Sequence, residues 1–525
     1  MKVLVTEAIS PSGLSRLSEE LSVDVREHLS AGELLACVAG YEGIIVRSVT
    51  RLNRQVLEKA ARLKVIGRAG TGVDNIDLET ATRLGILVVN APESNTLSAA
   101  EHAIALMMSL LRNIPLANKM LRDGRWDRKG LRGQEAHGKC LGIIGLGRIG
   151  SVVAGMAQGL GMSVIAYDPY ISPERFGRFG TERMEDLDDL CRRADIITVH
   201  TPKTDETYGM LGKREFGLMR PGVRIINCAR GGIVDEQALY QALKNGRAAG
   251  AGLDVFDSEP SQDNKLCRMD SVICTPHLGG STREALERVG RDIAEEIIRA
   301  LRGDLVQYPL NFPSTDPRLQ TFIKPFLALA GSMGRLFTQL FRPQIDELEL
   351  EYGGEISRYN TDLVRAALLQ GLLSPILEGQ VNMVNAGTLA SQRGIRIKES
   401  KVEEIEDYVN SLSVKASGHR IAGTVFGRND SRIIGIDDFK LDIVPHGPIL
   451  ISWHDSAHTR QPGVIGQIGN ILGQARVNIH RIEVGNSAKG HRAMLVLNLD
   501  DTPPGDIVKT IEKTPGVIDA RMILL

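Results

Sequence analysis

The feature that most constrains the fold of this chain is a glycine pattern between an apolar strand and a helix. The stretch at 145–150, Gly-Leu-Gly-Arg-Ile-Gly, fits the pattern GxGxxG and directly follows the apolar run Leu141–Ile144. A second β-rich run, Ser163–Tyr167, ends in Asp168. A strand, a glycine turn, a helix and a second strand that ends in an acidic residue predict a dinucleotide-binding unit. The glycine pattern alone is weak, and this context carries the prediction.

Each residue of this motif has a physical role. Gly145 permits the tight turn, Gly147 lets a pyrophosphate approach the backbone, and Gly150 allows the helix to pack closely. The helix N-terminus offers free N–H groups to the phosphates. Asp168 can accept hydrogen bonds from both ribose hydroxyls and would repel a 2′-phosphate, so NAD is favoured over NADP. The alternative is a glycine-rich turn in which Asp168 only caps a strand.

Alternating β-rich and amphipathic helical stretches continue to about residue 300, which indicates parallel α/β sheets. The strands expected before the glycine loop are Val3–Val5, Ile44–Val46, Val65–Ile66 and Ile86–Val89. Long helical stretches at about Leu97–Arg112 and Arg283–Arg302 flank a second alternating set. We therefore expect a nucleotide-binding domain at 98–283, inserted into a discontinuous domain at 1–97 and 284–313, with the two long helices as the hinge.

The character of the sequence changes after a polar linker with two prolines at 311–317. Residues 314–446 open with a helical stretch and continue with strand candidates such as Ile421–Phe426 and Ile433–Ile436. Residues 447–525 have the order strand, helix, strand, strand, helix, strand. This order is typical of a small ferredoxin-like α+β sandwich.

Charge and composition exclude several classes of function. The 63 basic and 64 acidic residues leave a net charge of −1, and only 4% of residues are aromatic, so a nucleic-acid partner is not expected. The sparse cysteines show no metal-type spacing, so we expect reduced thiols and no metal. The N-terminus reaches Glu7 before a signal-peptide core could form. We expect a soluble cytoplasmic protein without a membrane partner.

Three charged residues follow the ends of apolar runs in the second alternating set. Arg230 follows Val223–Ile226, Glu259 follows Gly252–Phe256 and His277 follows Val272–Cys274. Ligands of an open α/β sheet bind at the carboxyl ends of its strands, so these side chains are expected at one site. There His277 can take a hydroxyl proton, Glu259 can orient its ring, and Arg230 can bind a substrate carboxylate. Singly, each has a plainer interpretation as a turn histidine, a solvated carboxylate or a surface arginine. Cys228 is expected to be an inert buried thiol.

Several segments of the α/β part carry patterns that are specific to one enzyme family. They are RAGTGVDN (68–75), NTLSAAEH (95–102), GKCLGIIGLGRIG (138–150), NCARGGIVDE (227–236), GLDVFDSEP (252–260) and TPHLGGSTREA (275–285). They resemble the D-isomer-specific 2-hydroxyacid dehydrogenase family in its long form. The resemblance implies a discontinuous flavodoxin-like substrate domain with an inserted Rossmann NAD-binding domain, followed by an α+β intervening domain and a C-terminal ferredoxin-like ACT domain.

The resemblance also implies NAD-dependent oxidation of 3-phospho-D-glycerate to 3-phosphohydroxypyruvate, the first step of the phosphorylated route to L-serine, with Arg230, Glu259 and His277 as the catalytic set. The implied contacts to NAD are Thr71, Gly145, Gly147, Arg148, Ile149, Gly150, Asp168, Thr201, Cys228, Ala229, Asp254 and Gly279. The implied contacts to the substrate are Arg47, Ser48, Arg68 and Asn95. Whether Arg68 is instead an ordinary solvated arginine stays open. Arg128 is a weaker candidate, lent across a dimer interface.

The C-terminal segments resemble the remaining domains of the long form. Residues 380–386 and 423–427 resemble the intervening domain, and Pro462–Gly466 resembles an ACT loop. This implies L-serine as an effector with Asn478 as a contact, and a homodimer or homotetramer. Arg460 departs from the family, which carries an acidic or amide residue there, and the loop around it is longer than usual. Whether the tail regulates the enzyme or only assembles it therefore stays open.

Two other functions are compatible with the same motifs. One is a dehydrogenase of a different D-2-hydroxy acid, because the catalytic set serves the whole family, although the C-terminal domains argue against it. The other is an NAD-sensing protein-binding module, as in related transcriptional corepressors. The intact catalytic set and the ACT-like tail argue against that second alternative.

Overall fold

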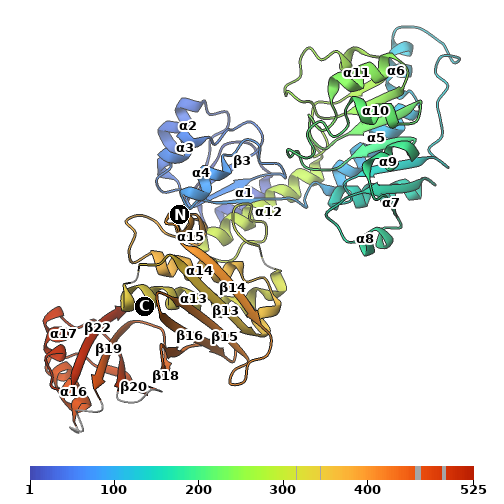
Figure 1. The fold of residues 1–525 in the computed structure, drawn as a ribbon. Coiled ribbons are helices and arrows are strands. Elements are labelled where there is room, and N and C mark those ends of the chain that lie inside the picture. The colour runs from blue at the N-terminus through green and yellow to red at the C-terminus, as the bar shows by residue number, and fades with distance from the viewer. Residues whose placement is uncertain (315, 343, 456–462, 488–491) are drawn as a thin grey trace.

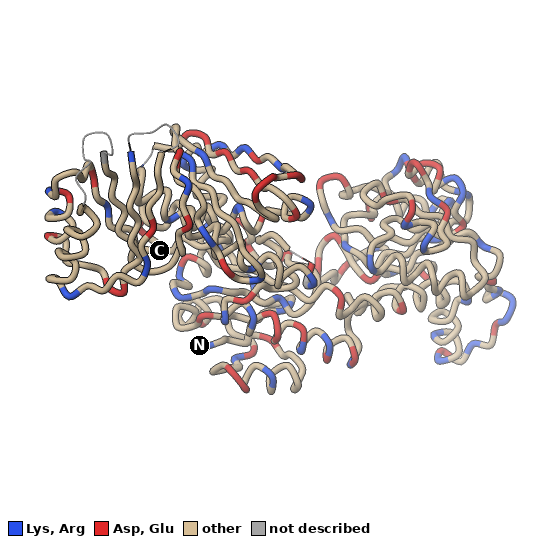
Figure 2. The backbone as a smooth tube through the Cα atoms, turned by 90° about the horizontal axis from the view of Figure 1, so that it is seen from below, with Lys and Arg blue, Asp and Glu red and all other residues tan. Residues whose placement is uncertain are grey.

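The computed structural model describes residues 1–525 except 315, 343, 456–462 and 488–491. Its four β-sheets follow one another along an elongated molecule (Figure 1). Lys and Arg are interspersed with Asp and Glu over all parts of the molecule (Figure 2). Within the described ranges, no helix has both the length and the apolar character needed to cross a bilayer.

The first sheet is built from short apolar runs of the N-terminal part. Its parallel strands are β1 (Lys2–Val5), β2 (Ser22–Val25), β3 (Gly43–Val46), β4 (Val65–Arg68) and β5 (Leu87–Asn90). They stand in the flavodoxin-like order β2-β1-β3-β4-β5. The surrounding helices are α1 (Pro11–Ser18), α2 (Ala31–Cys37), α3 (Arg54–Lys59), α4 (Leu78–Arg83) and, from much later in the chain, α12 (Arg283–Arg302). We call this assembly the first unit. Helices α1 and α12 bury one face of the sheet and α2–α4 the other.

The second sheet forms the second unit. Its parallel strands are β6 (Cys140–Ile144), β7 (Ser163–Tyr167), β8 (Glu182–Arg183), β9 (Ile196–Val199), β10 (Val223–Asn227), β11 (Ala248–Leu253) and β12 (Val272–Cys274). Their order is β12-β11-β10-β9-β6-β7-β8, which reverses between β6 and β9 and so creates a ligand crevice there. The helices are α5 (Thr96–Leu111), α6 (Ile114–Arg122), α7 (Arg148–Gly159), α8 (Pro173–Arg178), α9 (Leu187–Arg193), α10 (Lys213–Leu218) and α11 (Glu236–Lys244).

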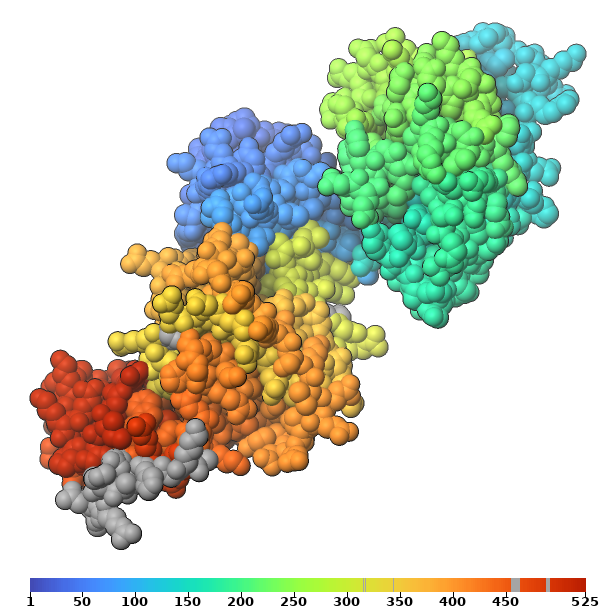
Figure 3. Space-filling view, viewed as in Figure 1, coloured from blue at the N-terminus to red at the C-terminus, as the bar shows by residue number. Residues whose placement is uncertain are grey.

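Helices α5 and α12 connect the first and second units. Both were expected as long helices, and α12 has the bounds that the sequence indicated. In Figure 1, α12 runs from the second unit back to the first. In Figure 3 the two units are separate bodies, blue and green, with a notch beside the narrow strip where they meet. The carboxyl ends of strands from both sheets supply the candidate site.

The C-terminal part contains the third and fourth sheets. The third unit comprises α13 (Gln320–Phe341), β13 (Glu347–Gly354), α14 (Asp362–Leu373), α15 (Ala386–Gln392), β14 (Arg396–Val402), β15 (Asn410–Ala416), β16 (His419–Phe426), β17 (Asp430–Ile436) and β18 (Phe439–Ile443). The fourth unit comprises β19 (Pro448–Asp455), α16 (Val464–Gln474), β20 (Ile479–Asn486), β21 (Arg492–Leu499), α17 (Gly505–Glu512) and β22 (Val517–Leu524). The fourth sheet is antiparallel in the order β20-β21-β19-β22, which confirms the ferredoxin-like expectation.

The same fourth sheet has two buried faces. Leu450 and Leu497 face α16 and α17, whereas Ile451 and Val496 belong to the apolar core of the third unit. The third and fourth units therefore share one core. Contrary to expectation, β11 ends at Leu253 rather than at Phe256.

Candidate active site

The glycine loop between β6 and α7 has the geometry that a dinucleotide site requires. Gly145 has φ of +90°, and a Cβ there would stand 2.8 Å from the carbonyl oxygen of His200. A Cβ on Gly150 would stand 2.1 Å from the carbonyl oxygen of Gly145. In contrast, apart from the chain neighbours of Gly147, no atom of the described residues lies within 4 Å of its Cβ position. Gly145 and Gly150 therefore permit the tight turn, and Gly147 leaves the outer side of the loop open.

The surroundings of this loop fit NAD. Helix α7 begins beside Gly147 with no side-chain hydrogen bond capping it, so its first N–H groups are available to a pyrophosphate. The hydroxyl of Thr201 is buried and has no hydrogen-bond partner among the residues that the structure describes. Asp168 follows β7, where its Oδ2 accepts from Leu146 N at 2.9 Å and its Oδ1 from Tyr170 N at 3.0 Å. Each carboxylate oxygen can still accept a further bond from a ribose hydroxyl.

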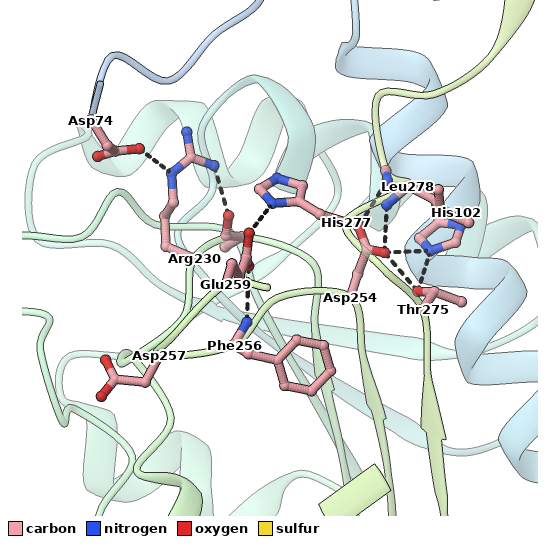
Figure 4. A network of polar contacts seen from close by, with 12 residues as sticks. Asp74, His102, Arg230, Asp254, Phe256, Asp257, Glu259, Thr275, His277 and Leu278 are labelled. Carbon is pink, nitrogen blue, oxygen red and sulfur yellow. Dashed lines mark hydrogen bonds and ion pairs between the residues drawn. The ribbon is translucent and has the colours of Figure 1, made fainter. Parts of the chain in front are cut away.

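His277 and Glu259 form the pair that sequence reasoning anticipated. His277 Nδ1 lies 2.8 Å from Glu259 Oε2, and Glu259 Oε1 accepts from Phe256 N at 3.0 Å (Figure 4). The hydrogen bond to Glu259 raises the pKa of His277 above its usual value, although burial opposes this. Burial would raise the pKa of Glu259, and the bonds from His277 and Phe256 outweigh it, so that pKa is lowered. His277 Nε2 has no hydrogen-bond partner in the part of the chain that the structure describes, and the side chain is 49% exposed.

The backbone around His277 is held by a carboxylate that the sequence had suggested as a cofactor contact. Asp254 is 0% exposed, and its oxygens accept from Leu278 N at 2.7 Å, Gly279 N at 2.8 Å and Thr275 Oγ1 at 2.6 Å. His102 on α5 lies 3.2 Å from Asp254 Oδ1. In this structure Asp254 therefore builds the turn that carries His277, whose φ of 56° is left-handed. His102 is the last residue of the motif NTLSAAEH (95–102), from which no role was expected for it.

Arginines from both units converge beside this pair. Arg230 Nε lies 3.5 Å from Asp74 Oδ2 of the first unit (Figure 4). Arg68 at the end of β4 has a buried Nε with no hydrogen-bond partner in the described part of the chain. Burial and the nearby charges of Arg230 and Arg47 lower the pKa of Arg68 to about 10. This group of like charges around an unpartnered N–H is what an anionic ligand would neutralise. Arg68 is thus not an ordinary solvated arginine.

The remaining residues that were expected to contact the substrate or NAD have the following surroundings. Asn95 Oδ1 accepts from Thr71 Oγ1 at 2.8 Å, and exposed Ser48 lies in the turn after β3. Arg148 at the start of α7 lies 3.6 Å from Glu93, and Ile149 packs against the core of the second unit. Ala229 donates its N–H to Asn227, and burial raises the pKa of Cys228, as expected of an inert thiol.

Two expected residues lie outside this site. Arg128 is exposed in the segment after α6. Asn478 is in the fourth unit, at the far end of the molecule from the second, where it donates to Asp500 Oδ2 at 2.7 Å (Figure 1). Arg460 falls outside the described residues. Among the residues that are described, no group of three or more His, Cys, Asp or Glu side chains could hold a metal ion.

Sequence comparisons agree with this geometry. Residues 104–279 match the "D-isomer specific 2-hydroxyacid dehydrogenase, NAD binding domain", residues 322–437 the "D-3-phosphoglycerate dehydrogenase intervening domain" and residues 456–516 the "ACT domain". The D-3-phosphoglycerate dehydrogenase of Archaeoglobus fulgidus is 44% identical over 100% of both chains. The chain belongs to the D-3-phosphoglycerate dehydrogenase family. It is an oxidoreductase of that family with an NAD-binding domain.

Other relatives support the same membership. The D-3-phosphoglycerate dehydrogenase of Bacillus subtilis is 39% identical over 99% of both chains. Among solved structures, a D-lactate dehydrogenase from Aquifex aeolicus in complex with NAD and lactic acid is 30% identical. It covers 57% of this chain and 96% of its own, with a TM-score of 0.53. The likeness to that structure supports the Rossmann-type arrangement of the α/β part and NAD as the cofactor.

Proposed function

We propose that this chain oxidises 3-phospho-D-glycerate with NAD to 3-phosphohydroxypyruvate, the first step of the phosphorylated route to L-serine, and also catalyses the reverse reaction. The observation that carries the proposal is the His277–Glu259 pair beside arginines contributed by two units. A base next to three convergent arginines suits an alcohol with an anionic group at each end. The names of the full-length relatives support the same substrate.

The proposed catalytic set is His277, Glu259 and Arg230. Arg230 binds the substrate carboxylate and directs the C2 hydroxyl toward Nε2 of His277. This nitrogen accepts the hydroxyl proton, because Nδ1 is held by Glu259. Glu259 stabilises the imidazolium that forms. NAD held at the 145–150 loop would supply the acceptor for the hydride that leaves C2. In the reverse reaction protonated His277 returns the proton to the carbonyl oxygen.

The phosphate of the substrate is proposed to bind at the first unit. Arg47 and Arg68 supply the charge, and Ser48 and Asn95 complete the polar lining. Arg68 is pre-organised for this role, because its buried Nε has no partner to give up. Thr71 and Asp254 are also proposed contacts to NAD. Thr71 donates to Asn95, and Asp254 accepts from the N–H of Gly279.

For the cofactor, the proposed phosphate contacts are the loop at 145–150, including Arg148 and Ile149, and the ribose contact is Asp168. Thr201, Cys228, Ala229 and Gly279 are the remaining proposed contacts. The unpartnered hydroxyl of Thr201 supports this assignment. The carboxylate of Asp168 favours NAD over NADP by repulsion of a 2′-phosphate.

Turnover with a panel of acids tests the function. NADH formation is followed with purified protein, NAD and 3-phospho-D-glycerate, D-glycerate, D-lactate or glycolate. The proposal requires 3-phospho-D-glycerate to have the highest kcat/KM. Equal or better turnover of an unphosphorylated acid would favour the alternative dehydrogenase, and tight NAD binding without any turnover would favour a sensing module. His277→Ala should abolish turnover while the Kd for NAD stays near that of the wild type.

We also propose that the chain forms a homodimer through α6 and the following segment. No residue of α6 is buried, and Ile114, Leu121 and Trp126 are 52%, 55% and 81% exposed. A groove of about 600 Å³ lies beside this helix. An acidic substitution, Leu121→Asp, should convert the dimer to a monomer in light scattering. An unchanged mass would reject α6 as the interface.

L-serine is the proposed effector of the fourth unit, with Asn478 as a contact. We also propose that the C-terminal units assemble the chain into a tetramer. The match to the ACT domain supports an effector-binding role. The test is the rate of NADH formation against L-serine concentration for the wild type and Asn478→Ala. No inhibition of the wild type would leave the tail as an assembly module.

A further inference from the structure

A carboxylate from the start of the chain closes the turn that carries Arg47. Glu7 follows β1, and its Oε1 accepts from Arg47 N and Thr50 N, both at 2.9 Å. Its Oε2 accepts from Ser48 N and Val49 N, both at 3.1 Å. Four successive backbone N–H groups thus point at one anion. Burial opposes the ionised form, but the N–H donors outweigh it and lower the pKa of Glu7, so the carboxylate is charged at neutral pH.

The same turn is held from its other side. Asn75 Nδ2 donates to the carbonyl oxygen of Arg47 at 2.9 Å and to that of Thr50 at 2.6 Å. The Arg47 side chain is also fixed, since its Nη1 donates to the carbonyl oxygen of Ala8 at 3.2 Å. The donors of the turn therefore face Glu7 and its acceptors face Asn75. Both the backbone and the guanidinium of Arg47 are tied to the Glu7–Ala8 segment.

This arrangement decides which groups can bind an external anion. Successive backbone N–H groups of a turn form a concavity that binds phosphate in many proteins. In this chain the protein's own carboxylate occupies that concavity, so a substrate phosphate has to be bound by side chains instead. The available ones are Arg47 and Arg68, whose charges lie close enough to affect each other. The negative charge of Glu7 also lies near Arg68, so it reduces the repulsion within this pair.

We propose that Glu7 is a positioning residue that sets the preference for a phosphorylated substrate by holding the Arg47–Thr50 turn and, through it, the Arg47 guanidinium. The inference rests on the proposed function, because it assigns the phosphate to Arg47. Glu7 itself need not touch the substrate. His277, Glu259 and the glycine loop at 145–150 belong to the second unit, and this turn belongs to the first.

Glu7→Gln tests the proposal with little change in shape. The amide oxygen can still accept from one side of the turn, but the amide NH₂ faces two N–H donors and repels them. The KM for 3-phospho-D-glycerate should rise about tenfold with kcat changed by less than about twofold, because the loss falls on binding at one end of the substrate. The kcat/KM for D-glycerate and the Kd for NAD should stay within about twofold of the wild type.

Glu33→Gln is the matched control. Glu33 also accepts from a backbone N–H, that of Ser30 at 2.8 Å, and it lies in the same unit at the start of α2. It contacts neither Arg47 nor Arg68, so its substitution should leave both KM values unchanged. Glu7→Asp keeps the charge with a shorter reach and should give a KM between those of the wild type and Glu7→Gln. In an Arg47→Met background, Glu7→Gln should add little to the KM.

The outcomes separate the inference from the function on which it rests. If the wild type does not oxidise 3-phospho-D-glycerate, the proposed function fails and the inference fails with it. If the wild type is active and Glu7→Gln has an unchanged KM, only the inference fails. Equal loss on D-glycerate and 3-phospho-D-glycerate, or a full Glu7→Gln effect in the Arg47→Met background, would also overturn it, because Glu7 would then act on the fold of the unit as a whole.

Discussion

The Glu259→Gln substitution should move the pH dependence of catalysis in a direction that the structure fixes. Glu259 Oε2 lies 2.8 Å from His277 Nδ1, and this contact is the main cause of the raised pKa of His277. Removing the negative charge leaves burial, which lowers the pKa. Oxidation requires neutral His277, so wild-type kcat/KM is lost as the pH falls through the raised pKa. In Glu259→Gln this acid limb should lie at lower pH.

The size of the shift follows from distance and exposure. A charged hydrogen bond contributes about 1.5–3 kcal/mol, and the lower end applies because the His277 and Glu259 side chains are 49% and 36% exposed, so solvent screens the pair. About 1.4 kcal/mol corresponds to about one pKa unit. The acid limb should therefore move down by about one pH unit. The rate should also fall by about 10–100-fold at all pH values, because the amide orients the ring less well.

The assay is kcat/KM for 3-phospho-D-glycerate between about pH 5 and 9, with 3-phosphohydroxypyruvate reduction followed in parallel. Reduction requires protonated His277, so its alkaline limb should move down by the same amount. Asp257→Asn is the control, because Asp257 pairs with Lys203 at 3.4 Å and not with His277. An unchanged acid limb in Glu259→Gln, or an equal shift in Asp257→Asn, would refute the assignment of His277 as the base that Glu259 tunes.

Three further predictions concern the cofactor end of the site. Gly147→Ala should leave the unfolding temperature unchanged, because no described atom beyond its chain neighbours lies within 4 Å of the new Cβ, yet it should raise the Kd for NAD at least about tenfold in fluorescence titrations. Gly150→Ala, with a contact at 2.1 Å, should lower the unfolding temperature by several degrees. Asp168→Ala should reduce the NAD/NADP ratio of kcat/KM by about tenfold or more, and an unchanged ratio would reject the ribose contact. Cys228→Ala should keep kcat within about twofold, and wild-type activity should survive iodoacetamide at pH 8, because burial raises the pKa of this thiol.

Local sequence was sufficient for the parts of the site that lie within one strand–turn–helix segment. The glycine loop was predicted because its glycines meet demands set by neighbouring residues. Arg230, Glu259 and His277 were predicted as a group because parallel strands bring their carboxyl ends to one edge. In contrast, β2 and β8 were not expected. Both are short strands at sheet edges with partly or fully exposed side chains, so their sequences lack an apolar run.

Other features depend on contacts between distant segments and had no local signal. Glu7 and Asp254 act through backbone N–H groups far along the chain, and a carboxylate in a sequence does not show which amides it will meet. The strand β13 is different, because its alternating Glu and Leu residues are a strand pattern that could have been recognised. Asp74 lies in the motif RAGTGVDN (68–75), but its pairing with Arg230 depends on how the first and second units are placed, which the motif does not show.

The distribution of charge between the units has a consequence for how the site binds its ligand. Arg47 and Arg68 belong to the first unit and Arg230 to the second, so the repulsion that lowers the pKa of Arg68 acts in part across the junction. An anion placed between them replaces this repulsion with two attractions, and its affinity is greatest where the arginines are close together. We therefore propose that a substrate with a negative group at each end favours approach of the units, whereas an acid with one carboxylate engages only one of them. On this proposal, preference for a phosphorylated acid and approach of the units both result from the same set of charges.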